Sequence, residues 1–419
     1  MKSKMALAFA VLRISLQGNQ KTLKMRLKYK FWILSIIITS ICIGQSSNDY
    51  FNVIKKEGIA PIEFVQEKLN TFDLIIFDDA LHSAAEPFDF YQELIEDHES
   101  SIDYIFIEVF GVNMQPLINA FLANSTKDST KILKVFQDDF SGLGWRYETY
   151  YNLLSTVWDV NQNIQDMSKK IKVIGVNQPI YWEGIYTYED FNIFNKSLIG
   201  RDYFMYKIIL NYMEEFNNNM KGIFLTNTRH AYKNIKRSDG KTYWNCGTFF
   251  NQWYTNKSYS IRIHNATLSI EAVRTDMEKH SIEGMDQIEY SWIKMENGLW
   301  DEAFKKNGDV PIALSLNNNA FGRTKYVGNH MLNVARGQTM FDAYDALIFL
   351  APLDKLYFSP RIDFIYTEVF KKELKRRIEI LNNDDLGEFL LKNNVDSIEE
   401  YIRQISTFQP KTKNNLVNE

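Results

Sequence analysis

The feature that most constrains the fold of this chain is a pair of apolar, strand-like runs joined by one helical segment. Residues 72–77 (FDLIIF) and 104–110 (YIFIEVF) are almost continuously apolar, and residues 86–97 between them have a helical pattern. Such strands are buried on both faces of a sheet, and a strand–helix–strand unit is typical of a right-handed crossover between parallel strands. The pattern predicts an α/β fold with a central, mostly parallel or mixed sheet flanked by helices.

The rest of the chain extends this pattern. Further strands are expected at residues 171–176, 221–225, 310–316 and 346–350, with one long strand or a hairpin at 258–273. Helices are expected at residues 114–124, 128–137, 203–216, 361–381, 384–392 and 397–406. The aromatic segments 138–160 and 178–190 have the composition of a cap or lid rather than of a sheet element. Because no Pro/Gly-rich linker interrupts the chain, residues 46–407 are predicted to form a single domain and 408–419 a disordered tail.

The first 45 residues predict export. A basic run at residues 21–30 precedes the uncharged, mostly apolar residues 31–43, which small and polar residues follow. This order is that of a secretory signal peptide, and the apolar stretch is shorter than the about 20 residues that span a bilayer. We expect a periplasmic or secreted protein with no stable membrane span once the signal is removed; a buried or membrane-anchoring helix is the alternative. Translation from Met25 would make the preceding residues an N-terminal extension.

Two cysteines bear on this export prediction. Cys42 would permit a lipoprotein signal, but the bulky Ile41 before it makes lipidation the less favoured reading. Cleavage after residue 45 leaves Cys246 as the single cysteine, so no internal disulfide is expected.

Composition narrows the class of partner. The chain has 419 residues, 45% of them hydrophobic and 24% charged, which is enough apolar material for a globular core. Its formal net charge is -4, and the lysines and arginines are spread along the chain. A nucleic-acid partner is therefore not expected.

Polar clusters follow the predicted strands, at the edge where open α/β sheets bind ligands. The first, DDALHSAAE at 78–86, contains His82, whose ordinary pKa of about 6.5 suits a general base. Glu86 lies one helical turn beyond it, and Asp79 precedes it. Capping of the following helix by Asp79, with Glu86 in solvent, is the structural alternative.

The second and third clusters are an acid and an arginine. Glu108 lies inside an apolar strand and needs a cation, a metal or a proton, because a buried unpaired carboxylate is costly. Arg201 could form a purely structural pair with it, or hold a substrate carboxylate or oxyanion. Asp202 is expected to cap the helix that follows, and Met205 to lie in the core.

The fourth cluster, TNTRH at 226–230, repeats the arrangement of strand, polar turn and histidine. His230 could bind a substrate oxygen, donate a proton or ligate a metal. His264 has no acidic neighbour in the sequence and received little weight.

In this order the clusters resemble the erythromycin esterase-like group, within the superfamily that includes the Tiki proteases and ChaN-type haem-uptake proteins. That superfamily has a Gly-Glu-x-x-His motif after its first strand, with a glutamate four residues later; here the motif is residues 78–82, followed by Glu86. Its strand glutamate matches Glu108, its Arg-Asp-x-x-Met helix start matches residues 201–205, and its second Gly-x-x-His matches residues 227–230. The resemblance covers about residues 70–350.

Three positions depart from the family pattern. Asp78 and Asn227 replace the two motif glycines, and Asp79 replaces the glutamate. Aspartate and asparagine tolerate left-handed backbone conformations better than most residues do. The departures affect the expected activity more than the expected fold.

The resemblance implies an ester or lactone hydrolase in which His82 activates water, with Glu86 or Asp79 orienting it and Glu108 setting the charge of the site. It also implies a small-molecule substrate, and it gives the stabilisation of the oxyanion to Arg201 and His230. Substrate contacts are expected from Asp79, Asn177, Trp182 and Arg229.

Two alternatives remain open. No cofactor is predicted, yet a divalent metal held by His82, Glu108 and His230 would make this a Tiki-like metallohydrolase or protease. A binding protein without catalysis, of the haem-uptake type, is the other alternative. Its flat or apolar ligand would lie among the aromatic residues of 143–158 and 180–190.

Overall fold

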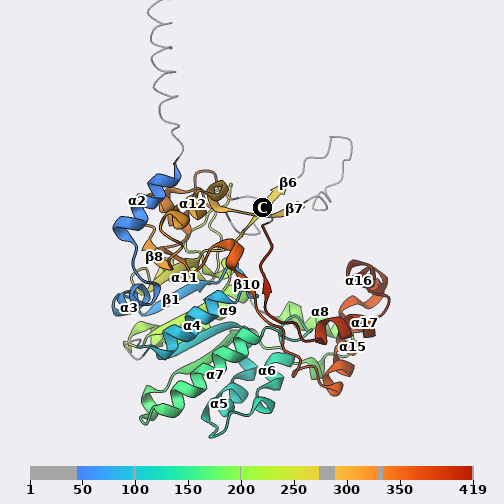
Figure 1. The fold of residues 1–419 in the computed structure, drawn as a ribbon. Helices are drawn as coiled ribbons and strands as arrows, with labels where there is room; N and C mark the ends of the chain where they lie inside the picture. Colours follow the sequence, from blue (N-terminus) through green and yellow to red (C-terminus); the bar gives the residue numbers. More distant parts are fainter. Residues whose placement is uncertain (1–44, 98–100, 199, 273–287, 328–333, 418–419) are drawn as a thin grey trace, which may run out of the picture. The chain divides into compact units, whose positions relative to one another are not determined.

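A seven-stranded sheet with the order β3-β2-β4-β1-β5-β9-β8 forms the centre of the protein (Figure 1). Its strands are parallel except that β8 runs antiparallel to β9. This confirms the predicted α/β fold with a mostly parallel sheet. The strands are β1 (Leu74–Asp78), β2 (Tyr104–Gly111), β3 (Lys172–Asn177), β4 (Gly222–Thr226), β5 (Ser258–Ile263), β8 (Ile312–Ser315) and β9 (Ala346–Phe349).

The computed structural model describes residues 45–97, 101–198, 200–272, 288–327 and 334–417. Ser47–Glu419 forms one compact unit. The predicted signal peptide, the Met25 start and Cys42 lie outside the described residues. Within the described ranges, no helix has the length and apolar character needed to cross a membrane.

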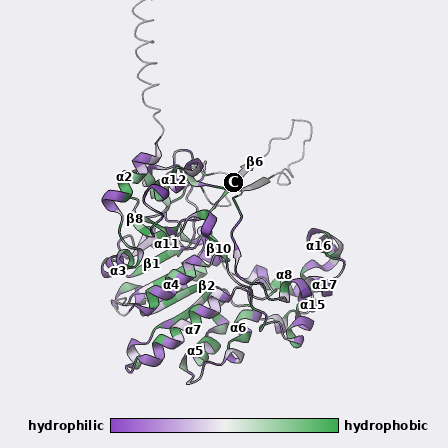
Figure 2. Ribbon diagram, in the orientation of Figure 1, coloured by the Kyte–Doolittle hydropathy of each residue, from purple (hydrophilic) through white to green (hydrophobic). Residues whose placement is uncertain are grey.

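Helices cover both faces of the sheet because its strands are apolar on both faces. In β1, Ile75 and Phe77 belong to one buried cluster, whereas Leu74 and Ile76 belong to a second on the opposite face. Figure 2 shows the hydrophobic residues concentrated on the strands and the hydrophilic ones on the outer sides of the helices. The first face is covered by α4 (Glu86–Glu96), α5 (Gln115–Ala123) and α7 (Glu148–Asn163), and the second by α9 (Arg201–Tyr212), α11 (Cys246–Trp253) and α12 (Leu299–Lys306).

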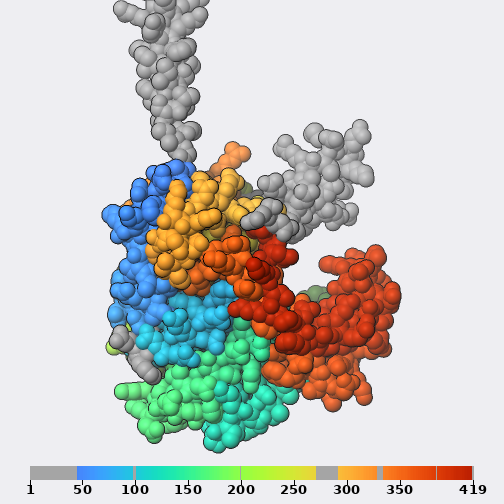
Figure 3. Space-filling model, viewed as in Figure 1, coloured from blue at the N-terminus to red at the C-terminus, as the bar shows by residue number. Residues whose placement is uncertain are grey.

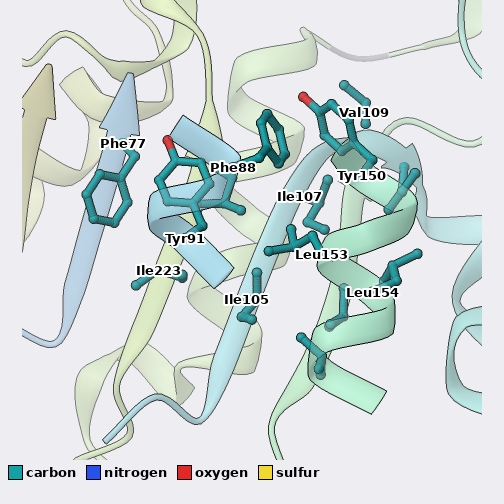
Figure 4. Close-up of a cluster of buried hydrophobic side chains, with 14 of the residues drawn as sticks. Phe77, Phe88, Tyr91, Ile105, Ile107, Val109, Tyr150, Leu153, Leu154 and Ile223 are labelled. Carbon is teal, nitrogen blue, oxygen red and sulfur yellow. The ribbon is translucent and has the colours of Figure 1, made fainter. Parts of the chain in front are cut away.

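Part of the predicted aromatic cap is instead a core helix. Within residues 138–160, α7 buries Tyr150, Leu153, Leu154 and Val157, which share one face at helical spacing. Figure 4 shows Leu153 of α7 directed toward β2 near Ile107, and Tyr150 of the same helix beside Phe88 of α4. The apolar spacing of this segment therefore outweighed its aromatic and polar composition.

Helices are present where they were expected at residues 114–124, 128–137, 203–216, 384–392 and 397–406, with shifted ends. The helix expected at 361–381 starts later, and the short helices at residues 320–323 and 340–343 were not expected. Residues 361–362 join extended segments: Arg361 bridges to Tyr147 and to Gln409, so the helix begins only at Glu368. The remaining helices are α2 (Ser47–Glu57), α3 (Pro61–Thr71), α6 (Leu133–Gln137), α8 (Tyr188–Ser197), α10 (Thr228–Ala231), α13 (Ala320–Arg323), α14 (Met340–Ala343), α15 (Glu368–Asn382), α16 (Leu386–Lys392) and α17 (Ile398–Ser406).

Residues 258–273 form neither one strand nor a hairpin. After β5 the chain turns, and β6 (Thr267–Ala272) pairs antiparallel with β7 (Ile288–Ile293) in a separate two-stranded sheet. The turn at residues 264–266 is stabilised by the Asn265 side chain, which accepts the backbone N–H of Ala266. One apolar-rich run thus supplies strands to two different sheets.

The C-terminal segment crosses the carboxyl edge of the sheet. Within it, β10 (Tyr357–Phe358) pairs with β11 (Thr412–Lys413), where a disordered tail was predicted. The Ala85 N–H donates to the Tyr357 carbonyl, so this segment lies against the turn that follows β1. Figure 3 shows the dark red residues of the C-terminal region running beside the cyan ones.

Candidate active site

Polar side chains gather where the central strands end. Asp78 at the end of β1 is in register with Thr226 at the end of β4 and with Arg262 in β5. Glu108 lies in β2, and Asn177 ends β3. Because the strands that carry them are neighbours and parallel, these residues reach one edge of the sheet, as the sequence predicted.

Glu108 is the centre of this cluster and is almost completely buried. Its Oε1 accepts from Arg201 Nη2 at 2.8 Å and lies 3.2 Å from His230 Nε2. Its Oε2 accepts from the Thr226 hydroxyl and from the Asn227 N–H. Burial raises the pKa of Glu108, but the two histidines and Arg201 outweigh it and hold that pKa well below its usual range. The carboxylate is therefore ionised and has partners on both oxygens.

His82 follows β1 and is partly exposed, unlike Glu108. Its Nδ1 lies 3.1 Å from Asp79 Oδ2 and 3.0 Å from the Tyr150 hydroxyl. Its Nε2 lies 2.8 Å from Asn227 Nδ2 and 3.5 Å from a Glu108 oxygen. An imidazole anchored through Nδ1 to a buried carboxylate is oriented as a general base requires.

The amide of Asn227 indicates which proton His82 carries. Asn227 Oδ1 accepts the Arg229 N–H and so caps α10, which directs Nδ2 toward His82. An amide nitrogen only donates, so His82 Nε2 acts as the acceptor and Nδ1 carries the hydrogen shared with Asp79. This hydrogen bond is made by the neutral imidazole, with its lone pair on Nε2, and is lost in the protonated form that predominates below the pKa of His82.

The surrounding carboxylates raise the pKa of His82 and so favour its protonated form. Burial lowers its pKa, but Asp79 and Glu108 outweigh burial and raise the pKa of His82 to about 10. Burial also raises the pKa of Asp79 to about 6, although His82 opposes this. The neutral, proton-accepting form of His82 is therefore favoured by rising pH.

His230 lies on the other side of Glu108 and is buried. Its Nδ1 lies 2.7 Å from Asp202 Oδ1, and its Nε2 is 3.4 Å from Arg201 Nη1. Burial lowers the pKa of His230, while Glu108 and Asp202 raise it to about 9. Asp202 does not cap α9 as predicted: Gly200 occupies the cap position, and Asp202 accepts from the Cys246 N–H as well.

A cavity of about 430 Å³ opens beside His82. Its polar lining includes His82, Asn227 and Arg229, with Arg262 also reaching it. Its apolar walls are made by Trp145, Tyr147, Leu81, Ala266, Leu268 and Trp292. The volume lies within the range of about 300–1,000 Å³ typical of small-molecule sites.

The predicted residues therefore separate into three groups. His82 and Arg229 line the cavity. Asp79, Glu108 and His230 are buried and, with the partly exposed Arg201, form the network behind it. Asn177 joins this network, since its Oδ1 accepts from Arg201 Nε at 3.0 Å. Asp79 thus holds His82. Asp79 and Asn177 were predicted to contact the substrate, but neither of them lines the cavity.

The third group, Glu86 and Trp182, lies outside the site. Glu86 begins α4 and accepts the Tyr357 N–H, so it neither orients His82 nor reaches the cavity. Trp182 was expected to touch the substrate, but it stacks on Phe191 in a separate buried cluster and donates to the Asp139 carbonyl. The C-terminal helix α15 covers this region and offers Arg377 to Trp182, which the sequence did not reveal.

The alternative of a divalent metal depends on whether His82, Glu108 and His230 are free to coordinate one. Both imidazoles lie near Glu108, but its two oxygens already accept from Arg201, Thr226 and the Asn227 N–H. The Arg201 guanidinium also places a permanent positive charge beside the carboxylate. Across the described ranges, no group of three or more His, Cys, Asp or Glu residues is arranged to hold a metal ion. In this arrangement His82, Glu108 and His230 do not fit a divalent cation.

Comparison with known proteins gives fold similarity alone. No protein-family model and no curated protein sequence matches the chain. A Bacillus cereus protein of known structure has a TM-score of 0.47 at 12% identity, covering 73% of this chain and 98% of that one. A mutant of erythromycin esterase EreC in its open conformation has a TM-score of 0.46 at 11% identity, covering 69% of this chain and 92% of that one. Haem-binding ChaN of Campylobacter jejuni gives 0.26 at 12%, covering 56% and 92%.

The substituted motif positions are explained by the local geometry. Neither Asp78 nor Asn227 has a positive φ; the left-handed residue of the first turn is Ala80, at φ 59°. The Asp78 side chain accepts the Ala80 N–H at 2.8 Å and stabilises this turn. Asp78 also pairs with the buried Arg262 at 3.1 Å, and the Tyr344 hydroxyl donates to it. The carboxylate at 78 is thus an integral part of the site's support.

Sequence reasoning missed three contributors to the site. Tyr150 reaches His82 from α7, Thr226 donates to Glu108 from β4, and Arg262 reaches the cavity from β5. Thr226 directly follows a predicted strand and Arg262 lies in one, so strand register would have found them. Tyr150 depended on the packing of α7, for which the sequence offers only the helical apolar spacing.

His264 also differs from expectation. Its Nε2 lies 3.1 Å from Asp301 Oδ1 of α12, although the sequence around it contains no acid. It is buried against Trp300, Phe304 and Phe349, which indicates a structural role. Its partner comes from a distant helix, which neighbour counting along the chain cannot detect.

Proposed function

We propose that this protein hydrolyses an ester or lactone by means of water activated by His82. One observation carries the proposal: His82 lines the cavity while its Nδ1 is held by the buried Asp79 carboxylate, which leaves Nε2 as the proton acceptor. The order of sequence motifs that resembles the erythromycin esterase-like group supports the ester or lactone as the bond cleaved.

In the proposed reaction, a water molecule replaces the Asn227 amide as the partner of His82 Nε2. His82 takes one proton from this water as the oxygen attacks the substrate carbonyl carbon. The carbonyl oxygen becomes an oxyanion, which the released Asn227 amide stabilises from the cavity wall. Collapse of the intermediate breaks the bond to the leaving oxygen, and protonated His82 returns the proton to that oxygen, giving acid and alcohol.

The buried network supports this chemistry without touching the substrate. Asp79 stabilises the imidazolium formed when His82 takes a proton. Glu108, held by Arg201 and His230, fixes the charge behind Nε2. Arg201 and His230 do not line the cavity, so their proposed role is to position Glu108 rather than to bind the oxyanion.

The test is a panel of ester, lactone and peptide substrates offered to the mature protein, with and without a chelator. We expect turnover of at least one ester or lactone that the chelator leaves unchanged, and loss of that turnover in His82→Asn. Turnover that depends on a stoichiometric metal, or activity on peptides alone, would contradict the proposal. Spectral changes on haem titration, with no ester turnover, would favour the binding-protein alternative.

Export also remains a proposal, supported by the basic and apolar order of residues 21–43. Sequencing the N-terminus of the protein recovered outside the cytoplasm tests it. We expect a start near residue 46; a start at Met1 or Met25 would contradict it.

A further inference from the structure

The charges that face the cavity are of one sign. The acidic side chains of this region, Asp78, Asp79 and Glu108, lie behind the wall in ion pairs or hydrogen bonds, and none of them lines the cavity. Among the described residues, the lining contains His82, Arg229 and Arg262 but no aspartate or glutamate. The charged side chains that a ligand meets in the described lining are therefore all positive.

Arg262 supplies the buried part of this positive lining. Its Nη1 donates to Asp78 at 3.1 Å and its Nη2 to the Thr267 hydroxyl at 3.2 Å. These partners hold the guanidinium in place and balance its charge. It is thus a fixed donor group at the cavity rather than a free cation.

Arg229 supplies the unbalanced charge. Its backbone is fixed at the start of α10 by the Asn227 side chain, while its own side chain is exposed at the cavity. Within the described part of the chain, no carboxylate forms an ion pair with its guanidinium. An arginine fork at a cavity wall matches the geometry of a carboxylate or another planar anion.

The remaining walls of the cavity are apolar, which further restricts the kind of ligand that can bind. Trp145, Tyr147 and Trp292 present aromatic surface, and Leu81 and Leu268 present aliphatic surface. Such walls bind rings and other apolar groups rather than a small polar anion.

Resting on the proposed function, we infer that the substrate is an anionic aromatic or alicyclic ester, whose ring packs on these walls while its negative group pairs with Arg229. The reacting carbonyl then lies toward His82, and the anionic group toward the start of α10.

The experiment compares two esters that differ by one charge, 6-acetoxy-2-naphthoate and 2-naphthyl acetate. The wild-type protein should have a kcat/KM about fivefold higher for the anionic ester, the factor expected of one partly exposed ion pair. Arg229→Gln should bring the ratio of the two kcat/KM values to about one, and Arg229→Lys should retain part of the preference. Raised ionic strength should reduce the wild-type ratio.

Arg403→Gln is the matched control, because it removes the same charge from an exposed position of α17. It should keep the wild-type ratio. A wild-type ratio near one, or a preference that survives Arg229→Gln, would overturn the inference while leaving the hydrolase proposal standing.

If neither ester is hydrolysed, the hydrolase proposal fails for these substrates and binding decides the inference. Titration with 6-hydroxy-2-naphthoate and with 2-naphthol is followed by tryptophan fluorescence, because Trp145 and Trp292 line the cavity. Tighter binding of the naphthoate in wild type but not in Arg229→Gln supports an anion site. Equal binding of the two compounds, or no binding of either, overturns it.

Discussion

The surroundings of His82 and His230 are the two regions whose comparison is most informative. Both histidines follow a buried strand, both approach Glu108, and both have a raised pKa. His82 lines a cavity with aromatic walls, whereas His230 is closed in between Glu108, Arg201 and Asp202. One histidine can meet a ligand, and the other can only influence the groups that do.

This difference shows that sequence symmetry does not imply equal chemical roles. The turn after β1 places its histidine at the cavity, where Leu81 and Ser83 on either side of His82 also line the wall. The turn after β4 exposes Arg229 instead and directs His230 inward, against Asp202 of α9. Access to the cavity therefore assigns His82 and Arg229 to the substrate, and His230 to the supporting network.

Removing the orienting carboxylate should have the largest effect. In Asp79→Asn, an amide replaces the acceptor at His82 Nδ1, so the imidazole loses both its preferred tautomer and the charge that stabilises the imidazolium. We expect kcat/KM to fall about 10³-fold or more, measured with an ester substrate. Asp89→Asn, an exposed change in α4, is the control. A fall of less than tenfold would remove Asp79 from the proposed machinery.

Glu108→Gln should weaken the whole buried network. The change leaves Arg201 and His230 without their shared anion, and breaking a buried ion pair costs about 3 kcal/mol of unfolding free energy. Denaturant unfolding measures this loss. Glu399→Gln, which removes an exposed partner of Lys375, should cost much less, because solvent screens an exposed ion pair. Equal losses in the two variants would show that the network is not a source of stability.

Stability should also depend on pH through both histidines. Their pKa values are about 10 and about 9 in the folded protein, against an unfolded value of about 6.5. The stabilisation is therefore fully present below about pH 6.5 and is lost as pH rises through 9 to 10. Melting temperatures measured from pH 6 to 10 should fall by several degrees, and less so in His230→Asn. A melting temperature that rises over this range would contradict the charge assignment.

The smallest effect is expected from Glu86→Gln. The glutamine oxygen can still accept the Tyr357 N–H, and Glu86 contacts neither histidine. We expect kcat/KM within about twofold of wild type and a small change in melting temperature, because the hydrogen bond is kept and Glu86 does not line the cavity. A loss above tenfold would restore the role that the sequence motif gave to Glu86.

Much of the fold could be predicted because its determinants are local. The apolar runs of β1 to β4 and the polar residues that end them are visible in the sequence, so the sheet edge and four of its chemical groups were expected: His82, Glu108, Arg201 and His230. What failed depended on contacts between distant segments. The pairing of β10 with β11 and the burial of Trp182 under α15 both involve the C-terminal region.

The sequence predicted which residues belong to the site better than it predicted which of them contact one another. Spacing placed Glu86 and Asp79 equally well beside His82, and only the turn at Ala80 selects Asp79. Likewise, spacing predicted that Asp202 caps a helix. In the structure His230 approaches from the turn after β4, and Asp202 is its hydrogen-bond partner in the network. Side-chain direction after a turn is the information that the sequence lacked.

The most direct test of the division between the two regions is to measure kcat/KM and melting temperature for His82→Asn and His230→Asn on the same ester. The account predicts that His82→Asn loses about 10³-fold in kcat/KM. His230→Asn should keep at least about a tenth of the wild-type value and lose more in melting temperature, because removing the buried partner mainly weakens the network. If His230→Asn is as inactive as His82→Asn while both remain equally stable, His82 is not the distinct general base.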